Sequence, residues 1–340
     1  MHAHHHRWRR RSNAFAVILA LAVLQAAPAS SAELTPFKVG ITDAVNTVLP
    51  VWMAEAGGFY EAQGLKVEIV NMGGGSRGAQ ELQAGRIDLM RVGLSSVIQT
   101  NRAGGDLRLI ASMSNVIRFT FFSAAGVKTA ADLKGGVIGV STFGSESDST
   151  VTLALERLGL SRNDVALKEY GGSARRLAAL KSGEIKATAI NEPAASMARE
   201  QGVNVMVDLV AEQIPWVFSG VVVKRGDIVM RRDVITRFLK AVIEGNYLAL
   251  TDEARAKAVL AKELKLTDPK IIDISYDDFK AQSPVDMKPS LKGAENVMDQ
   301  VLGPGNRDVL RYLDYGILAD LNNDGLFGRL EQKYGASGRR

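Results

Sequence analysis

The sequence predicts an α/β protein of two lobes, with two parallel-rich sheets flanked by helices and a two-strand hinge. Short β-rich runs alternate with helical stretches along most of the chain, a pattern typical of parallel sheets with crossover helices. A second series of the same kind begins near residue 132, so two such sheets are expected. The segment GGSRGAQELQAGRIDLM at 74–90 also returns, with a one-residue change of register, as GGSARRLAALKSGEIKA at 171–187.

The hydrophobic patterns predict the elements of the first series in order. They are a strand over 37–42, a helix over 48–63 that begins near Pro50, a strand over 65–72, the first Gly-Gly-Ser helix, and strands over 88–93 and 107–113. Residues 116–125 have the long extended character of a strand that crosses to the second lobe.

The second series repeats this order before the chain turns mostly helical. It comprises a strand over 132–141, a helix over 147–158, a strand over 165–171, the second Gly-Gly-Ser helix and a strand over 187–193. A strand over 217–224 is expected to return the chain to the first lobe, and 231–250 has the apolar face of an amphipathic helix. The predicted lobes are 33–118 with 222–340 for lobe 1, and 119–221 for lobe 2.

Residues 1–32 have the pattern of a secretory signal peptide. Four arginines between residues 7 and 11 precede the apolar run AFAVILALAVL, and small residues at Ser30 and Ala32 fit a cleavage site. The apolar run is too short to span a bilayer, although a retained membrane anchor is the alternative. Arg10 and Arg11 hint at twin-arginine export, but the residues after them favour the general secretory route. We therefore expect a periplasmic protein exported across the inner membrane.

Removal of this leader changes the composition that matters for function. The formal charge of +5 loses four arginines, so 308 residues with a charge of +1 remain and nucleic-acid binding loses its support. All four histidines lie in the leader, and the chain has no cysteine. Triads that need His or Cys, and zinc or copper sites that they would ligate, are therefore excluded. Without disulfides, a hydrophobic core must stabilise the fold.

The repeated Gly-Gly-Ser segments predict two helix starts that offer backbone N–H groups to one ligand. Glycines allow a close approach, the serine can cap the helix, and a helix N-terminus favours an anion. Two ordinary strand–helix turns are the alternative.

Four segments in the same order resemble the substrate-binding proteins of ABC importers of the nitrate, sulfonate and taurine class, which share a fold with thiamine-precursor binders. They are LPVWMAEAGGFYEAQGLKVEIV, GGGSRGAQELQAGRIDL, DLKGGVIGVSTFGSESDSTVTLALERLGL and GGSARRLAALKSGEIKATAINEPAAS. The resemblance implies the type II periplasmic-binding-protein fold, a cleft that closes on its ligand, no cofactor and no catalytic activity. The cysteine-rich motif and histidine of the family's thiamine-precursor synthases are missing, which excludes that enzyme branch.

The resemblance also implies a ligand site in loops at the carboxyl ends of strands, in agreement with the general rule for open α/β sheets. Simple helix capping is the alternative for each residue alone. The candidate ligand-binding residues are Thr42, Asp43, Asn46, Thr47, Gly75, Ser76, Ser95, Ser96, Thr142, Gly144, Ser145, Glu146, Ser147, Asp148, Asn191, Glu192 and Trp216.

Trp216 and Arg118 have two interpretations each. Trp216 either stacks on a ligand or packs between the lobes, whereas Trp52 lies in a helix pattern and is expected in the core. Arg118 pairs either with an anionic ligand or, as the preferred interpretation, within a hinge salt bridge. The acids among the candidates weigh against a purely anionic ligand such as nitrate, and favour an amine-bearing sulfonate or a neutral heterocycle.

The predicted function is capture of a small organic solute, sulfonate- or taurine-like by family, and its delivery to an ABC permease in the inner membrane by a monomeric binder. A pyrimidine, thiamine-precursor-type or aromatic solute is one alternative ligand. A periplasmic sensor that uses the same cleft and a hydrolytic enzyme built without His or Cys are the rival functions.

The segment DLNNDGLFGRLE at 320–331 fits the spacing of an EF-hand calcium loop. Asp320, Asn322, Asp324 and Glu331 have the required offsets, with Gly325 at the turn. An Asn-Asn-Asp-Gly turn between two helices explains part of the pattern without an ion. Both interpretations stay open on the sequence alone, and our prediction contains no metal.

Overall fold

The computed structural model describes residues 1–2, 33–305 and 308–335. The chain divides into two units at Glu33, and the fold described below belongs to the unit that begins at Leu34. Apart from its first two residues, the predicted signal peptide lies outside the described part of the chain. Within the described ranges, no helix is both long and apolar enough to cross a membrane.

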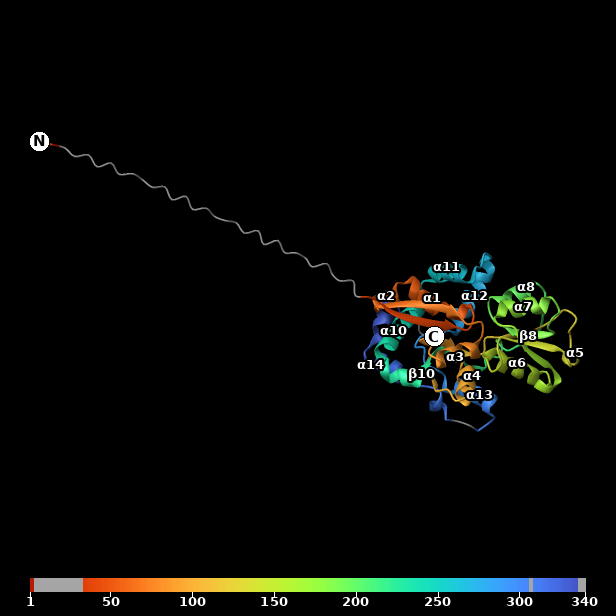
Figure 1. The fold of residues 1–340 in the computed structure, drawn as a ribbon. Coiled ribbons are helices and arrows are strands. Elements are labelled where there is room, and N and C mark those ends of the chain that lie inside the picture. Colours follow the sequence, from red (N-terminus) through yellow and green to blue (C-terminus); the bar gives the residue numbers. More distant parts are fainter. Residues whose placement is uncertain (3–32, 306–307, 336–340) are drawn as a thin grey trace. The chain divides into compact units, whose positions relative to one another are not determined.

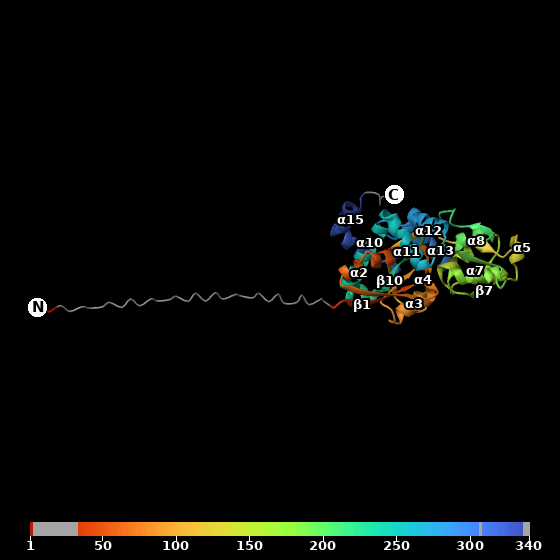
Figure 2. The same cartoon turned by 90° about the horizontal axis from the view of Figure 1, so that it is seen from above.

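The second unit contains two five-stranded sheets (Figures 1 and 2). The first has the strand order β2-β1-β3-β10-β4, with β1 (Thr35–Ile41), β2 (Leu65–Asn71), β3 (Leu89–Val92), β4 (Leu107–Val116) and β10 (Pro215–Lys224). The second has the order β7-β6-β8-β5-β9, with β5 (Thr120–Ser123), β6 (Val137–Val140), β7 (Ala166–Glu169), β8 (Ala187–Ile190) and β9 (Asn204–Asp208).

Both sheets are parallel apart from one strand each. In the first sheet β1 pairs in parallel with β2 and β3, while β10 pairs antiparallel with β3 and β4. In the second sheet β6 pairs in parallel with β7 and β8, while β5 pairs antiparallel with β8 and β9. The two opposed strands are those that enter a sheet from the other one. The sheets are therefore mixed, and the predicted α/β fold is confirmed.

Two crossovers connect the sheets, and they bear on the predicted lobe limits. The first runs through residues 117–119 between β4 and β5, so the strand predicted over 116–125 is broken there. The second lies between β9 and β10. Because β10 pairs within the first sheet from Pro215 onward, the predicted limit at residue 221 falls inside a strand of that sheet. We propose that the lobes follow the two sheets, with lobe 2 ending before β10.

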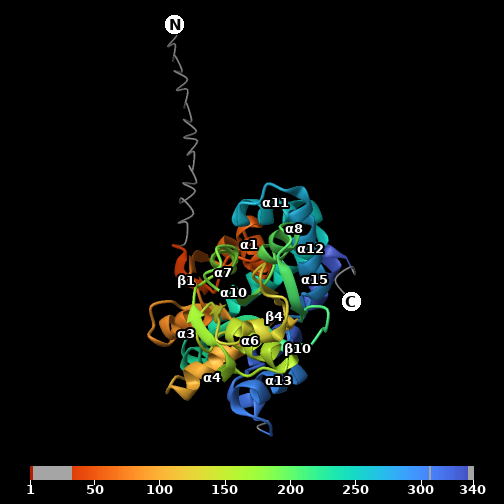
Figure 3. The same ribbon diagram turned by 90° about the vertical axis from the view of Figure 1, so that its right-hand side faces the viewer.

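Helices cover both sheets, and Figure 3 looks from the side of the second sheet, where α6, α7 and α8 lie. The helices are α1 (Leu49–Ala56), α2 (Phe59–Ala62), α3 (Gly75–Gln83), α4 (Leu94–Arg102), α5 (Ala130–Leu133), α6 (Glu146–Arg157), α7 (Ser173–Lys181), α8 (Ala194–Glu200), α9 (Arg225–Met230), α10 (Arg232–Thr251), α11 (Glu253–Leu264), α12 (Pro269–Gln282), α13 (Leu291–Leu302), α14 (Gly316–Asn323) and α15 (Leu326–Tyr334). Three short 3-10 helices are η1 (Asn46–Val48), η2 (Arg162–Asp164) and η3 (Val309–Arg311).

Local sequence accounts for where these helices begin and end. The helix predicted over 48–63 is two helices, because Gly58 adopts a left-handed conformation with φ of 70° that separates α1 from α2. The predicted amphipathic helix is α10, which buries Val234, Phe238 and Val242 and packs along α1. Trp52, on α1, is buried in the core as expected. This core holds the first sheet in place, and the loops of that sheet line one side of the cavity described below.

The EF-hand-like segment has the geometry of two helices joined by a turn. Asp320 lies within α14 and forms an ion pair with Arg232, and Gly325, with φ of 73°, separates α14 from α15. A calcium loop of this type would instead keep residues 320–331 coiled around the ion. The described residues contain no group of three or more His, Cys, Asp or Glu side chains that could hold a metal ion.

Candidate ligand site between the two sheets

A cavity of about 50 Å³ lies where the carboxyl ends of strands from both sheets meet. Thr42 and Asp43 follow β1 and Gly93 follows β3, whereas Ser141 follows β6 and Asn191 follows β8. Strand ends leave loop backbone and short polar side chains free at a sheet edge, which is where ligands bind in folds of this kind. The volume suits a small polar group and a few waters.

Arg91 is a buried cation in β3 that lines this cavity. Its guanidinium donates to the hydroxyl of Thr42 at 3.1 Å, to that of Ser219 at 2.9 Å and to the hydroxyl of Thr47. Hydroxyls are its only side-chain partners, and it forms no ion pair within the described part of the chain. Burial lowers the pKa of Arg91 to about 10, while the negative charge of Asp43 opposes that shift. Arg91 is therefore charged at neutral pH.

Arg176, on α7, brings a second buried cation to the same cavity from the other sheet. Its guanidinium donates to Ser173 Oγ and to the carbonyl oxygen of Ala189, both at 3.0 Å, and to the carbonyl of Gly171. It also lies over the ring of Phe119, 5.8 Å from the centroid. Burial lowers its pKa to about 10, so it too stays protonated at neutral pH. None of the described carboxylates forms an ion pair with it.

Three buried side-chain polar atoms on cavity-lining residues have no hydrogen-bond partner among the described residues. They are Nε of Arg91, Nε of Arg176 and Oγ of Ser96, all buried. A buried donor without an acceptor costs free energy, roughly 1–3 kcal/mol or more for a charged group. An acceptor-rich ligand in the cavity would remove that cost.

Two carboxylates connect the lobes, because each accepts a hydrogen bond from the N-terminus of a helix in the opposite lobe. Asp43, after β1, accepts the N–H of Ser173 at the start of α7 at 2.7 Å. Glu146, at the start of α6, accepts the N–H of Ser95 in α4 at 2.6 Å and the hydroxyl of the same residue at 3.0 Å. Negative charge is favourable at a helix N-terminus, so each contact stabilises the closed arrangement of the lobes.

Glu146 is fully buried, and burial raises its pKa to about 7. Hydrogen bonds from Trp216 and Ser95 favour the ionised form and oppose this shift. The carboxylate therefore titrates near neutral pH while it joins α6 to α4.

The two Gly-Gly-Ser helices meet at the cavity, but their caps differ from the sequence prediction. Gly75 of α3 and Ser173 of α7 both line it. Neither serine caps its own helix: Ser76 Oγ donates to the carbonyl of Phe143 at 2.7 Å, and Ser173 Oγ donates to Asn191 at 2.7 Å. Instead the opposite lobe supplies the acceptors, Asp43 for α7 and the hydroxyl of Thr142 for Ser76 N–H, at 3.2 Å.

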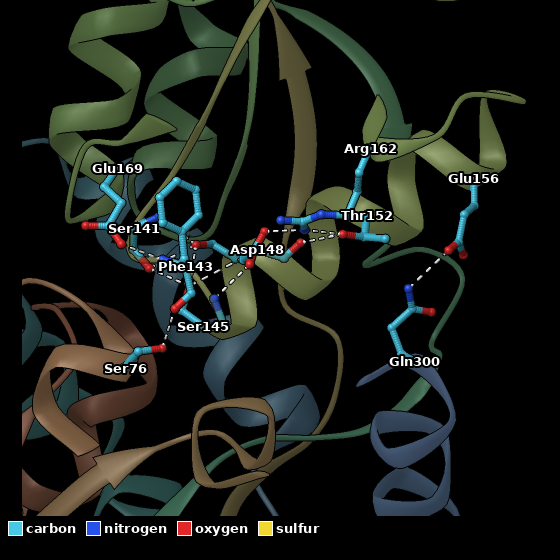
Figure 4. A network of polar contacts seen from close by, with 12 residues as sticks. Ser76, Ser141, Phe143, Ser145, Asp148, Thr152, Glu156, Arg162, Glu169 and Gln300 are labelled. Atoms are coloured by element: carbon cyan, nitrogen blue, oxygen red, sulfur yellow. Dashed lines mark hydrogen bonds and ion pairs between the residues drawn. The ribbon is translucent and has the colours of Figure 1, made fainter. Parts of the chain in front are cut away.

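The loop before α6 carries a network of polar contacts that reaches α3 in the other lobe (Figure 4). Ser76 of α3 reaches the carbonyl of Phe143, whose own N–H donates to Glu169 at 2.7 Å. Ser145 caps α6 by accepting the N–H of Asp148, as the sequence suggested for this loop. The carboxylate of Asp148 in turn accepts the N–H of Gly144 at 2.7 Å.

The predicted site residues divide into two groups. Those that line the cavity are Thr42, Asp43, Gly75, Ser96, Ser145, Glu146, Ser147 and Asn191. Those that lie outside its lining are Asn46, Thr47, Ser76, Ser95, Thr142, Gly144, Asp148, Glu192 and Trp216. Whether either group binds ligand stays a prediction.

Several residues of the second group have a structural partner instead. Thr47 accepts a hydrogen bond from Arg91. Ser95 donates one to Glu146. Glu192 forms an ion pair with Arg199 at 3.2 Å, and Asp148 forms one with Arg162 at 2.5 Å.

Asn46 contributes to a network at the first crossover. Its amide donates to the carboxylate of Asp278, on α12, at 2.7 Å and to the carbonyl of Ser275 at 2.9 Å. The same carboxylate forms the ion pair with Arg118, which is buried at the crossover. The hinge salt bridge preferred for Arg118 is therefore present.

Trp216 packs in the core and does not line the cavity. Its side chain is 2% exposed, and its Nε1–H donates to Glu146 Oε2 at 2.6 Å. We expect Trp216→Phe to lower the free energy of unfolding by about 1–3 kcal/mol, because a buried carboxylate loses a donor. Chemical denaturation measures this effect, and calorimetry should find ligand affinity within about threefold of wild type. Lost affinity at unchanged stability would instead support stacking on the ligand.

The most important residues missed by the sequence prediction are Arg91 and Arg176. Phe119, Phe218 and Ser219 were also missed, as were residues beside the predicted ones: Val45, Val92, Gly93 and Ser141. Gly172 and Ser173 were predicted only as part of the second Gly-Gly-Ser segment. A signal for Arg91 was present, since an arginine within a strand that is otherwise apolar must find a polar partner. Arg176 gave a weaker signal, because the helical pattern around it does not show which face is buried.

Comparison with known proteins places the chain in a family. The model of the NMT1/THI5-like family matches residues 46–256, more than half of the chain. The protein belongs to the NMT1/THI5-like family. The predicted resemblance is confirmed by this family match. Solved structures with a similar fold include sulfonate-binding proteins, which agrees with it.

The similar proteins differ in the ligand that their names give. The riboflavin-binding protein RibY of Chloroflexus aurantiacus is 28% identical over 244 residues, 67% of this chain and 68% of its own length. The periplasmic aliphatic sulphonate-binding protein SsuA of Escherichia coli has the same fold, with a TM-score of 0.61 and 24% identity over 82% of this chain and 96% of its own. The fold also occurs in an enzyme, the desulfurization enzyme DszB, seen as a Cys-to-Ser mutant with biphenyl-2-sulfinic acid. That structure has a TM-score of 0.62 and 16% identity, covering 85% of this chain and 99% of its own.

Proposed function

We propose that this NMT1/THI5-like protein is the periplasmic solute-binding component of an ABC importer, and that its ligand is a small organic anion such as an alkanesulfonate. The lobes close over the anion, and a permease in the inner membrane receives it from the monomeric binder. The observation that carries the proposal is the pair of buried guanidinium groups, Arg91 and Arg176, that face one cavity and form no ion pair with any described residue.

Burial of two cations beside the cavity carries a free-energy cost. Arg91 and Arg176 are held by hydroxyls, carbonyls and an aromatic ring, and the negative charge of Asp43 offsets their desolvation only in part, since the pKa of each is still lowered. A sulfonate supplies a further negative charge and three acceptor oxygens for charge-assisted hydrogen bonds, which are among the stronger hydrogen bonds in proteins. The unpartnered Nε atoms of both arginines and the Ser96 hydroxyl supply donors for them.

The acids that favoured a mixed ligand on the sequence alone are mostly engaged elsewhere. Asp148 and Glu192 pair with arginines outside the cavity. Asp43 and Glu146 line the cavity, but each already accepts backbone N–H groups of the opposite lobe. The lining holds two cations and these two acids, and burial raises the pKa of Glu146 to about 7, so positive charge exceeds negative charge near neutral pH. This supports an anion without an amine.

Other ligands and functions fit less well. Riboflavin, the ligand named for RibY, is a neutral ring system far larger than a cavity of about 50 Å³, so the lobes would have to open to admit it. A neutral pyrimidine would leave both guanidinium groups unpaired. The described residues hold neither His nor Cys in or near the cavity, so we also propose that the protein binds its solute without turning it over.

A thermal-shift screen tests the proposal on the mature chain. The compounds are taurine, alkanesulfonates, nitrate, aromatic acids, pyrimidines and riboflavin. A ligand at about 100 times its Kd stabilises the folded state by about 2.7 kcal/mol, so a sulfonate should raise the thermal midpoint of a chain of this length by roughly 4 °C. A shift with riboflavin or a pyrimidine and none with any anion would overturn the proposed ligand class.

Closure of the lobes can be tested separately at Gly74. A methyl group added there would lie 2.4 Å from Cγ2 of Thr142 in the opposite lobe, while the extended backbone of Gly74 tolerates alanine. We expect Gly74→Ala to hold the lobes apart and weaken sulfonate binding about tenfold. Small-angle scattering should show a larger radius of gyration, and adding Thr142→Ser should restore both values. An unchanged radius would mean that this contact does not limit closure.

A further inference from the structure

A groove at the mouth of the cleft carries a second pair of arginines. It has a volume of about 740 Å³, and its lining includes Asp43, Arg77, Glu169 and Arg175. Asp43, Ser141 and Gly172 line both this groove and the inner cavity, so the two spaces adjoin. A ligand held in the cavity would therefore extend into the groove.

Arg77 and Arg175 come from opposite lobes and from corresponding places in the chain. Arg77 lies in the first turn of α3 and Arg175 in the first turn of α7, the two Gly-Gly-Ser helices. A methyl group added at Gly171 would lie 3.3 Å from the carbonyl oxygen of Gly73 and 3.9 Å from NH1 of Arg175. One added at Gly73 would lie 3.7 Å from NH1 of Arg77. The two guanidinium groups thus flank a point where the lobes touch.

Neither arginine has a structural role that explains its position. Both are exposed, and neither forms a hydrogen bond or an ion pair within the described ranges. A cation in the first turn of a helix also opposes the helix dipole. Two arginines placed in this way at one groove lower the stability of their helices, but they favour the binding of an anion there.

The carboxylates of the groove are already engaged by backbone donors. Asp43 accepts the N–H groups of Ala44 and Ser173, at 2.9 and 2.7 Å. Glu169 points toward the loop before α6 and accepts the N–H of Phe143 (Figure 4). Arg77 and Arg175 are therefore available to a ligand.

We propose that Arg77 and Arg175 bind a second anionic group, so that the preferred solute is a dianion with a short spacer between its charged groups. This inference rests on the proposed function, because the inner anionic group occupies the cavity beside Arg91 and Arg176. The outer group binds at the mouth, where closure of the lobes brings the two exposed guanidinium groups to it. Specificity for two charges then comes from the two Gly-Gly-Ser helices together.

Matched probes separate this inference from the proposed function. Calorimetry on the mature chain at 0.15 M salt compares propane-1-sulfonate, with one anionic group, and propane-1,3-disulfonate, with two. We expect the disulfonate to bind about tenfold more tightly, since solvent-exposed charges contribute modestly. The Arg77→Gln/Arg175→Gln double variant should lose this preference and keep its propane-1-sulfonate affinity within about twofold.

Arg225→Gln is the control, because Arg225 is also exposed, forms no ion pair within the described ranges and lines none of these spaces. It should change neither affinity. Equal affinities for the two probes in wild type, or a preference that survives in the double variant, would overturn the inference while the proposed function stands. If neither probe binds, the proposed anion site fails and the inference falls with it.

Discussion

Arg91→Met is expected to weaken propane-1-sulfonate binding by about 100-fold or more. The variant loses a charge-assisted hydrogen bond and half of the positive charge that faces the cavity, and hydrogen bonds to charged groups contribute about 1.5–3 kcal/mol each. Isothermal titration calorimetry measures the affinity. The thermal midpoint of the ligand-free protein should not fall, because the buried cation that is removed forms no ion pair among the residues that the structure describes.

The control for this prediction is a buried arginine that does form an ion pair. Arg108 is 9% exposed, lies at the start of β4 and forms an ion pair with Asp106 at 2.7 Å. Arg108→Met should lower the thermal midpoint and leave binding intact. If Arg91→Met binds the sulfonate as wild type does, the ligand does not use this cavity as we propose.

Raising the pH from 5.5 to 8 is expected to lower the free energy of unfolding by about 2 kcal/mol through Glu146 alone. Its pKa is raised by burial from 4.5 to about 7 in the folded protein. The folded state therefore binds a proton that the unfolded state has lost, and stability decreases as the pH rises through the folded pKa. Ionisation is complete above about pH 8, so little further loss is expected there.

Glu146→Gln isolates this contribution, because glutamine keeps an acceptor oxygen and does not ionise. Burial also raises the pKa of Glu192, which adds a dependence of the same sign, so the quantity to compare is the difference between wild type and variant. Thermal denaturation at pH 5.5 and pH 8 should show a loss of thermal midpoint roughly 3 °C smaller in the variant. Parallel pH profiles for the two proteins would show that Glu146 does not titrate in this range.

The fold was predictable because local pattern and chain order determine it. Alternating strand and helix runs gave both sheets, and the extended residues 116–125 and 217–224 gave the two crossovers near their observed places. The errors were local. Gly58 divides one predicted helix, since a single glycine in a left-handed conformation ends a helix without changing the surrounding hydrophobic pattern.

The site was predictable only in its loops. Polar residues that follow strands, such as Thr42, Asp43 and Asn191, lie at the cavity because parallel strands end at one edge. Arg91 and Arg176 were missed, since the face on which a strand or helix residue lies depends on packing between elements. The two acids Asp148 and Glu192 misled the prediction of ligand charge, because their arginine partners come from other elements of the fold.

The sequence by itself determined the α/β order, the repeated Gly-Gly-Ser helices and the absence of Cys and of His after the leader. These depend on composition and on short-range periodicity, which any one segment shows alone. Only the tertiary structure decided that the helices receive their caps from the opposite lobe, and that two unpaired guanidinium groups share one cavity. The net charge of a buried site depends on residues that are distant in sequence. A local sequence pattern therefore cannot predict it.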